Sequence, residues 1–256
     1  MSKLTPNNPS PLPVLISERT ARAIDFRLCR VITGPYTLAS NASPNDYDIV
    51  LVDATGLNVG DGIAMFQNSS NPASYFGIVL GIAANTLTMD TPVDRSFLTA
   101  STPLIFEVNC QANVDGSVTP QIHSVVNGST IPIHITRVII HITDGTAMDD
   151  GTFGGIAALT RGVVLRKLNA DGSFDNYWNR AVKTNGDFGL LSFDIAYDSK
   201  APAGVYGFRM KYSFSGEDKH GVTCELLEDE QLQLVVQDDL TGLVSFQIMA
   251  EGHLDA

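Results

Sequence analysis

Residues 188–214 read FGLLSFDIAYDSKAPAGVYGFRMKYSF, and they carry the clearest alternation of apolar and polar residues in the chain. Apolar side chains occupy every second position before the segment SKAPAG and again after it. Because successive side chains of a strand point to opposite faces, each half predicts a strand with one apolar and one polar face. Two such strands joined by a Pro/Gly turn predict an antiparallel hairpin that covers a hydrophobic core.

Short strand-like runs separated by turns continue on both sides of this hairpin. Further strands are predicted at residues 131–143, 161–168, 174–182, 222–227, 231–237 and 243–252. No helical pattern separates them, so residues 110–256 are predicted to form an antiparallel β-sandwich or jelly roll. The polar, Gly/Pro-containing segment 111–121 marks the expected start of this domain.

Shorter strands are predicted upstream, at residues 48–52, 59–66, 74–82, 85–90 and 103–108. They are separated by turns rich in Asn, Asp and Gly. This spacing predicts a small SH3-like β-barrel over residues 31–109. With 256 residues and 44% hydrophobic residues, the chain is long enough and apolar enough for two all-β domains.

Residues 1–30 are predicted to be a separate N-terminal unit. The prolines at positions 6, 9, 11 and 13 exclude regular structure and predict an extended arm. Ser17 is a suitable N-cap for one short helix over 17–30, with Ala21, Ile24 and Leu28 on one face.

Charge divides the chain unevenly. Residues 1–30 hold five basic and two acidic residues, a net charge of +3, whereas the whole chain carries −12 and the remainder therefore −15. Such a balance argues against binding a phosphate backbone, so no nucleic-acid partner is expected. A basic arm on an acidic body favours docking onto an acidic neighbour, with Arg19, Arg22 and Arg27 as interface residues. A leader that happens to contain several arginines is an equally good reading of the same charges.

Cysteine usage and hydropathy bear on the compartment. Cys29, Cys110 and Cys224 are odd in number and show no metal-type spacing, so free, buried thiols in a reducing cytoplasm are expected. No signal peptide and no membrane span are expected, because no apolar run is long enough.

No stretch carries a catalytic motif, so an enzyme is not expected, and no cofactor or metal site is predicted. The acidic loop at residues 144–155 fits no calcium-loop spacing and is read as a solvated loop. His134 and His141, seven residues apart on one strand, are expected on opposite faces and cannot share an ion without a bulge. Tyr177 and Trp178 are the candidate aromatics for stacking a sugar ring, although a core position for Trp178 is favoured.

Several phrases resemble virion structural proteins of tailed bacteriophages. They are ATGLNVGDGIAMF and SYFGIVLGIAANTLTMDTPVDRSF in the barrel segment, NVDGSVTP, DDGTFGGIAALTRGVVLR, VKTNGDFG and the ending QDDLTGLVSFQIMAEGH. The resemblance implies a multicopy neck, collar, tail-tip or fibre-base protein, located in the virion after synthesis in the host cytoplasm. Its partners would be other virion proteins and copies of itself, and it implies no catalytic residue.

Two alternatives belong to other functional classes. One is a carbohydrate-binding module that recognises a host-surface glycan through an exposed aromatic patch. The other is a capsid decoration protein.

Overall fold

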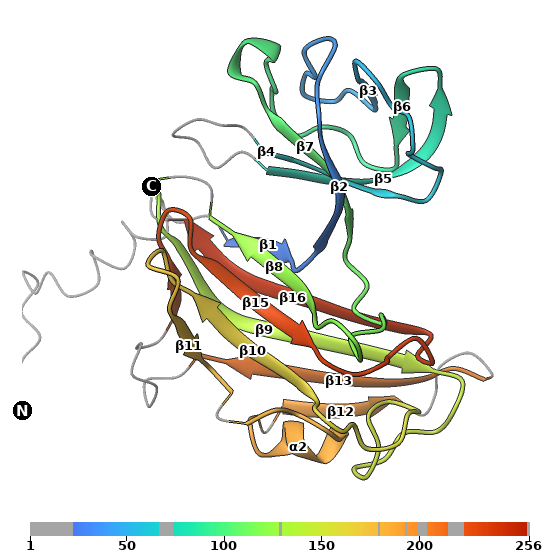
Figure 1. Cartoon of the computed structure of the whole chain (residues 1–256), viewed down its shortest axis with the longest axis vertical. Coiled ribbons are helices and arrows are strands. Elements are labelled where there is room, and N and C mark those ends of the chain that lie inside the picture. Colours follow the sequence, from blue (N-terminus) through green and yellow to red (C-terminus); the bar gives the residue numbers. More distant parts are fainter. Residues whose placement is uncertain are drawn as a thin grey trace, which may run out of the picture.

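The protein is built almost entirely from antiparallel strands, as the sequence predicts (Figure 1). A computed structural model describes residues 23–66, 74–127, 130–178, 180–192, 194–198, 204–214 and 223–254. The strands form three sheets, two of which pack together as a sandwich while the third forms a smaller module. None of the three sheets closes into a barrel along its ladder of strands.

The first sandwich sheet has the order β1-β16-β9-β13-β12, with β14 paired to β9. Its strands are β1 (Ala23–Arg27), β9 (Ile133–Asp144), β12 (Asp194–Asp198), β13 (Tyr206–Ser213), β14 (Cys224–Leu226) and β16 (Ser245–Leu254). The second sheet has the order β11-β10-β15-β8. Its strands are β8 (Gln121–Val126), β10 (Val163–Leu168), β11 (Phe174–Asn176) and β15 (Gln231–Val236).

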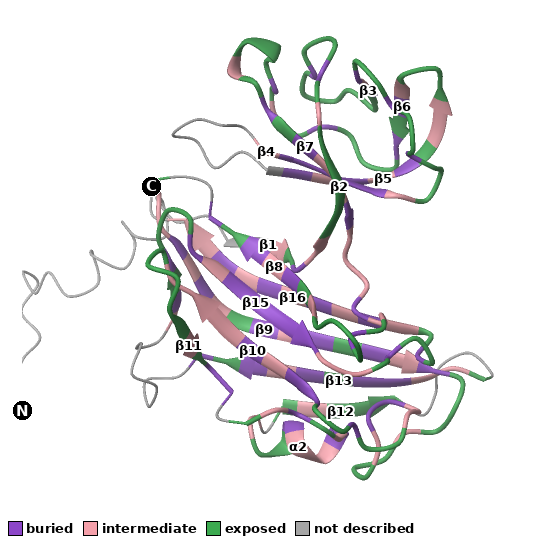
Figure 2. Ribbon diagram, viewed as in Figure 1, coloured by how far each residue is buried: buried purple, intermediate pink, exposed green. Residues whose placement is uncertain are grey.

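One hydrophobic core lies between these two sheets (Figure 2). Most of its aromatic pairs meet edge to face or tilted, as their ring charge distribution favours, and Phe188 stacks on Phe208. The largest members are Phe153, Trp178, Phe188, Phe208 and Phe246. The two-sheet sandwich is therefore held by side chains from both sheets, and the more specific jelly-roll topology stays a prediction.

The predicted hairpin is confirmed. β12 pairs with β13 in antiparallel register, with Ile195 opposite Met210 and Tyr197 opposite Phe208. The buried residues of β13 alternate with exposed ones, whereas β12 lies at the edge of the sheet and is mostly exposed. The alternation in the sequence thus correctly located the strand pair.

The small module is a six-stranded sheet of order β2-β7-β4-β5-β6-β3. Its elements are β2 (Arg30–Tyr36), β3 (Asp48–Val50), β4 (Gly62–Phe66), β5 (Ser74–Ala83), β6 (Thr86–Met89), a 3-10 turn η1 (Thr99–Ser101) and β7 (Leu104–Asn109). It has its own core, which includes Ile49, Ile63, Met65, Leu87 and Phe97. A single bridge, Leu38 with Leu51, joins the chain just after β2 to the chain just after β3. The SH3-like barrel also stays a prediction.

The prediction of a short helix over residues 17–30 is wrong for the described residues, which begin at Ala23. Ala23–Arg27 form strand β1, which pairs with the C-terminal strand β16 from Ala23 opposite His253 to Arg27 opposite Met249. Backbone pairing with an edge strand replaces the marginal isolated helix that the apolar spacing suggested. Elsewhere in the described part of the chain, helix α2 (Asn185–Gly189) begins at a capping box made by Thr184 and Asp187.

β1 belongs to the sandwich, and the small module therefore interrupts the sandwich between β1 and β8 (Figure 1). The chain enters the small module through residues 28–30 and returns through residues 109–112. Two other predictions were incomplete: β8 was not anticipated, and the strand predicted at 174–182 ends at Asn176 because Tyr177 and Trp178 turn into the core.

Candidate assembly interface

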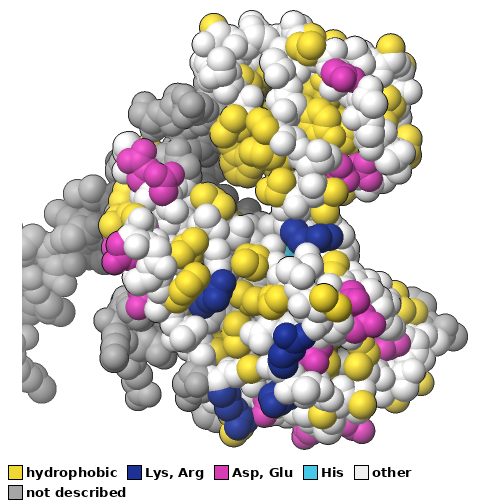
Figure 3. All heavy atoms as spheres, viewed as in Figure 1, with side chains coloured by type: hydrophobic (Ala, Val, Ile, Leu, Met, Phe, Trp, Pro, Cys, Tyr) yellow, Lys and Arg dark blue, Asp and Glu magenta, His cyan; other side chains and the backbone are white. Residues whose placement is uncertain are grey.

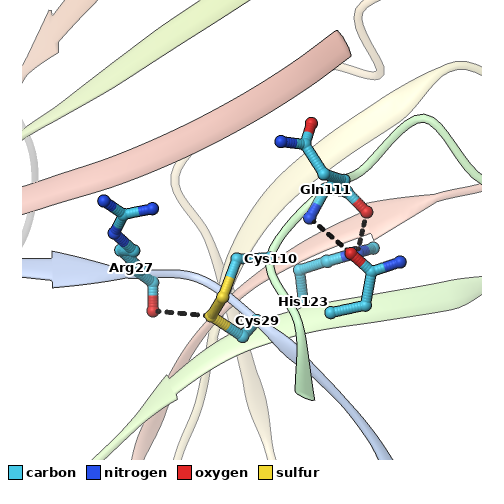
Figure 4. The surroundings of a disulfide bond; sticks show 6 residues. Arg27, Cys29, Cys110, Gln111 and His123 are labelled. Atoms are coloured by element: carbon cyan, nitrogen blue, oxygen red, sulfur yellow. Dashed lines mark hydrogen bonds between the residues drawn. A yellow bond between two sulfur atoms is a disulfide. The ribbon is translucent and has the colours of Figure 1, made fainter. Parts of the chain in front are cut away.

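The two chain segments that join the small module to the sandwich are linked by a disulfide between Cys29 and Cys110 (Figure 4). The prediction of free thiols is wrong for this pair. β2 and β7 are antiparallel neighbours with Arg30 opposite Asn109, so the next residues outward, Cys29 and Cys110, lie side by side. A separation of 81 residues hides this proximity in the sequence. The third cysteine, Cys224, is free and buried, and burial raises the pKa of its thiol to about 12.

Backbone hydrogen bonds also hold both segments against the sandwich. The Leu28 amide donates to the Ile248 carbonyl (3.3 Å), and Cys29 and Ser124 exchange two amide-carbonyl bonds (3.2 and 2.9 Å). On the returning segment, the Ala112 amide donates to the Phe246 carbonyl (2.7 Å). Both connecting segments are thus hydrogen-bonded to the sandwich, and the disulfide joins them to each other.

A buried polar group lies beneath this base. His123 on β8 is fully buried, and its Nε2 donates to the Gln111 carbonyl at 3.0 Å (Figure 4). Burial, together with the nearby Arg30 charge, lowers the pKa of His123 to about 4, so the imidazole is neutral at pH 7. Among the described residues, His123 Nδ1, Gln111 Oε1 and Arg30 Nε have no hydrogen-bond partner.

Of the three predicted interface arginines, Arg19 and Arg22 lie outside the described residues. Arg27, near the C-terminal end of β1, places its guanidinium 5.0 Å from the ring centroid of Phe76 on β5. The side chain therefore spans from the sandwich to the small module by a cation–π contact. Its predicted contact with a carboxylate of a neighbouring subunit stays a prediction.

Phe76 belongs to an apolar surface on the outside of the small sheet, here called the aromatic face. Its members share one side of four neighbouring strands, as their pairing shows: Ala64 lies opposite both Phe76 and Phe106, and Phe66 opposite Leu104. The face consists of Val31, Ala64, Phe66, Phe76, Ile78, Leu104, Phe106 and Val108. None of the eight is charged. Figure 3 shows apolar side chains gathered on the surface of the small module.

The aromatic face is separate from both cores. Phe66, Phe76 and Phe106 are half-buried, and none of them packs with either buried cluster of the described residues. Phe66 and Phe106 contact each other at 6.2 Å between ring centroids. At the rim, Leu104 is 41% and Val31 55% exposed. Gly62 leaves room for the ring of Phe76, because a Cβ at this position would lie only 3.1 Å from Phe76 Cε2 and 2.6 Å from the Val108 carbonyl oxygen.

Tyr177 and Trp178, the predicted sugar-stacking residues, are both buried in the sandwich core. Trp178 is 1% exposed and packs edge to face against Phe188 and Tyr212. Burial raises the pKa of the Tyr177 hydroxyl well above its usual value. Neither ring presents a face to solvent, so the core position favoured for Trp178 holds.

The histidine prediction is corrected by a β-bulge. In the pairing of β9 with β16, Arg137 lies opposite Glu251 and Ile135 opposite Gly252, which leaves Thr136 as an extra residue. His134 and His141 therefore face the same side of the sheet. His134 lies 3.8 Å from Glu225 and stacks on His253 with ring centroids 5.1 Å apart. No three metal-ligating side chains of the described chain are arranged to hold an ion.

The acidic loop at residues 144–155 is anchored to its surroundings. Asn185 of α2 donates to the Asp149 carbonyl and accepts from the Gly154 amide, both at 3.1 Å. The Tyr197 hydroxyl donates a hydrogen bond to the Asp150 carboxylate. Burial, and to a smaller extent this hydrogen bond, raises the pKa of Tyr197. Asp149 and Asp150 remain exposed, as expected for a solvated loop.

Comparison with known proteins gives little. No protein-family model and no curated protein matches the chain. Among solved structures, one match is the Gp54 tailspike of Acinetobacter baumannii bacteriophage AP22 in complex with A. baumannii capsular saccharide. The match has a TM-score of 0.28 and 20% identity, and it covers 34% of this chain and 15% of the tailspike chain. A score this low establishes no shared fold. In the described part of the chain, no helix is long and apolar enough to cross a membrane.

Proposed function

We propose that this protein is a non-enzymatic structural component of a tailed-bacteriophage virion that acts by assembling in several copies. It would occupy the neck, collar, tail tip or fibre base after synthesis in the host cytoplasm. Its partners would be copies of itself and other virion proteins. The phrases quoted above support the virion assignment, and the aromatic face supports action by assembly.

The aromatic face is the observation that carries this proposal. Strands whose two faces are both buried have nearly continuous apolar sequences, and β4 (GIAMF) and β7 (LIFEVN) are of this kind. The inner side of these strands covers the core of the module, but their outer side covers no core of the described residues. Contiguous apolar patches of this type are characteristic of protein-protein interfaces.

Immunogold labelling of intact source particles tests the proposal, with an antibody raised against residues 160–256. Label at the neck or tail tip would confirm a structural role and identify the position in the particle. Uniform label over the head would instead indicate a decoration protein. If particles carry no label while the denatured protein is detected in the same sample, the virion assignment fails.

The predicted arm contacts have a separate test. Replacing Arg19, Arg22 and Arg27 together by Ser should abolish incorporation into particles, because the arm loses its positive charge towards the acidic body. Normal incorporation of a folded triple variant would exclude this role for the arginines.

A host glycan is the second candidate partner, favoured by one surface of the sandwich. Phe174 on β11 is 48% exposed, and the Arg166 guanidinium lies 3.9 Å from its ring centroid. Arg166 also donates to Gln233 (2.9 Å), and Gln233 donates to Gln231 (2.9 Å). An exposed aromatic ring with a guanidinium group beside it suits a polar sugar, and the buried Gln233 fixes the position of Arg166.

Binding of host polysaccharide that is lost in Phe174→Ala but kept in Leu190→Ala, another exposed apolar residue, would support this alternative. Equal binding by both variants would exclude this surface as the glycan site.

A further inference from the structure

We propose that the aromatic face of one copy binds the proline-rich residues 9–16 (PSPLPVLI) of a neighbouring copy. This inference rests on the proposed function, because it requires that several copies assemble. It identifies the partner that covers the face.

The chemistry of residues 9–16 fits the face. The segment contains three prolines and the apolar residues Leu12, Val14, Leu15 and Ile16, and no charged residue occurs between Leu4 and Ser17. Proline-rich segments in general lose little conformational entropy on binding and dock on surfaces lined by aromatic rings. Proline also lacks an N–H group, so fewer backbone donors lose water when the segment lies on an apolar surface.

The charges next to the segment fit the surroundings of the face as well. Arg19 and Arg22 follow the apolar residues directly. Residues 30–109, which include the small module, contain two basic residues (Arg30 and Arg95) and seven acidic ones, a net charge of −5. An apolar segment followed by arginines thus meets an apolar face on an acidic module, which favours this orientation of the arm.

The position of β1 favours a neighbouring copy over the same copy. Arg27, close to where β1 leaves the sandwich for the small module, contacts Phe76 of the face. From Arg27 back to Ala23, β1 runs along β16 towards His253. Four strand residues span about 13 Å, so the start of β1 lies about that far from the contact with Phe76. A copy's own arm would have to reverse direction to return to Phe76. A chain of 14 residues, the number from 9 to 22, can span up to about 45 Å.

Disulfide crosslinking between two differently tagged full-length variants tests the proposal. One carries Leu12→Cys in the arm, and the other carries Leu104→Cys at the exposed rim of the aromatic face. After mixing under mild oxidation, a covalent heterodimer should form. The control replaces Leu104→Cys by Val52→Cys, a more exposed site (60%, against 41% for Leu104) that follows β3 and contributes nothing to the face. The heterodimer yield should be about tenfold lower in the control, because docking raises the local concentration of one thiol near the other.

Three results would overturn the proposal. They are equal yields with Leu104→Cys and Val52→Cys, no heterodimer at all, or an internal crosslink in the Leu12→Cys/Leu104→Cys double variant without heterodimer on mixing. The last result would assign the face to the arm of the same copy. Adding Phe106→Ser to the Leu104→Cys chain should also reduce the yield of heterodimer. The circular dichroism spectrum of this double variant must be unchanged, which shows that it is still folded.

The failure of this inference is distinguishable from the failure of the proposed function. Particles that carry gold label at the neck or tail, together with no arm crosslink, would leave the virion role intact and remove only the arm as occupant of the face.

Discussion

The sandwich and the small module use apolar residues differently. In the sandwich, β9 and β16 alternate between buried and more exposed residues, and the apolar side of β9 lies in the shared core. In the small module, β4 is apolar on both sides and β7 is so except for Glu107 and Asn109, although only one side covers a core. The small module therefore leaves an apolar surface outside its core, which the proposed partner would remove from water.

The two units also differ in how they can be observed. The single tryptophan, Trp178, lies in the sandwich core, and the small module contains none. Tryptophan fluorescence therefore reports on the sandwich alone, while circular dichroism reports on both units. This difference makes the following experiments selective.

The largest effect on stability is expected from removing a buried aromatic ring from one of the two cores. Phe246→Ala should lower the free energy of unfolding of the sandwich by about 3–5 kcal/mol, because a fully buried aromatic ring is lost and a cavity remains. The urea midpoint from Trp178 fluorescence should fall accordingly. The matched change in the small module, Phe97→Ala, should leave that midpoint in place and shift only the circular dichroism transition. Equal shifts of the fluorescence midpoint by both changes would show that the two units unfold as one.

The disulfide is expected to have the next largest effect. Replacing Cys29 and Cys110 together by Ser should lower stability by about 2–4 kcal/mol, because the unfolded chain regains the freedom of a long loop between residues 81 positions apart. Urea unfolding of the oxidised protein, the double variant and the protein treated with reductant measures this. The double variant should match the reduced protein and should not respond to reductant. A double variant as stable as the oxidised protein would contradict this role.

His123 makes the sandwich sensitive to acid. Its pKa is about 4 in the folded protein and about 6.5 when unfolded, so below pH 6.5 the unfolded chain binds the proton and the folded chain does not. Stability should be independent of this group above pH 6.5 and should fall between pH 6.5 and 4, by about 3 kcal/mol at pH 4. The His123→Gln variant should lose this part of the pH dependence, as measured by Trp178 fluorescence in urea.

The matched control for His123 is His141→Gln, which alters an exposed histidine of β9. It should keep the full decline in stability between pH 6.5 and 4. An unchanged decline in His123→Gln would show that other groups, such as the carboxylates, cause the acid sensitivity.

Sequence patterns located the strands that alternate or lie between clear turns, and they failed where tertiary pairing decided the structure. β12, β13, β15 and β16 were predicted because their own side chains show which face is buried. β1 was mistaken for a helix, since the spacing of Ala21, Ile24 and Leu28 also suits a helix, and only the free edge of β16 makes a strand there. The one-residue bulge at Thr136 changed the face of His134, and a single extra residue leaves no compositional mark.

The candidate interface was predictable only in part. The strands at residues 59–66 and 103–108 were predicted, but the aromatic face was not, because which side each residue faces depends on strand pairing. The proximity of Cys29 and Cys110 depends on the small module interrupting the sandwich, which no local pattern indicates. Arg27 was predicted as an interface residue from charge alone, and its ring partner Phe76 could not be anticipated because it lies 49 positions away.

The smallest effect is expected from the contact between Arg27 and Phe76, which bears most directly on how the two units are joined. A double-mutant cycle with Arg27→Gln and Phe76→Leu should give a coupling energy of about 0.5–1 kcal/mol, typical of a partly exposed cation–π pair. Arg27→Gln with Phe106→Leu, a ring of the same face on another strand, is the control pair and should be additive. Circular dichroism in urea is the measurement, because it includes the small module. A coupling near zero would mean that the disulfide and the backbone bonds at residues 28, 29 and 112 hold the module alone. Arg27 would then be available to a neighbouring subunit, as the sequence predicted.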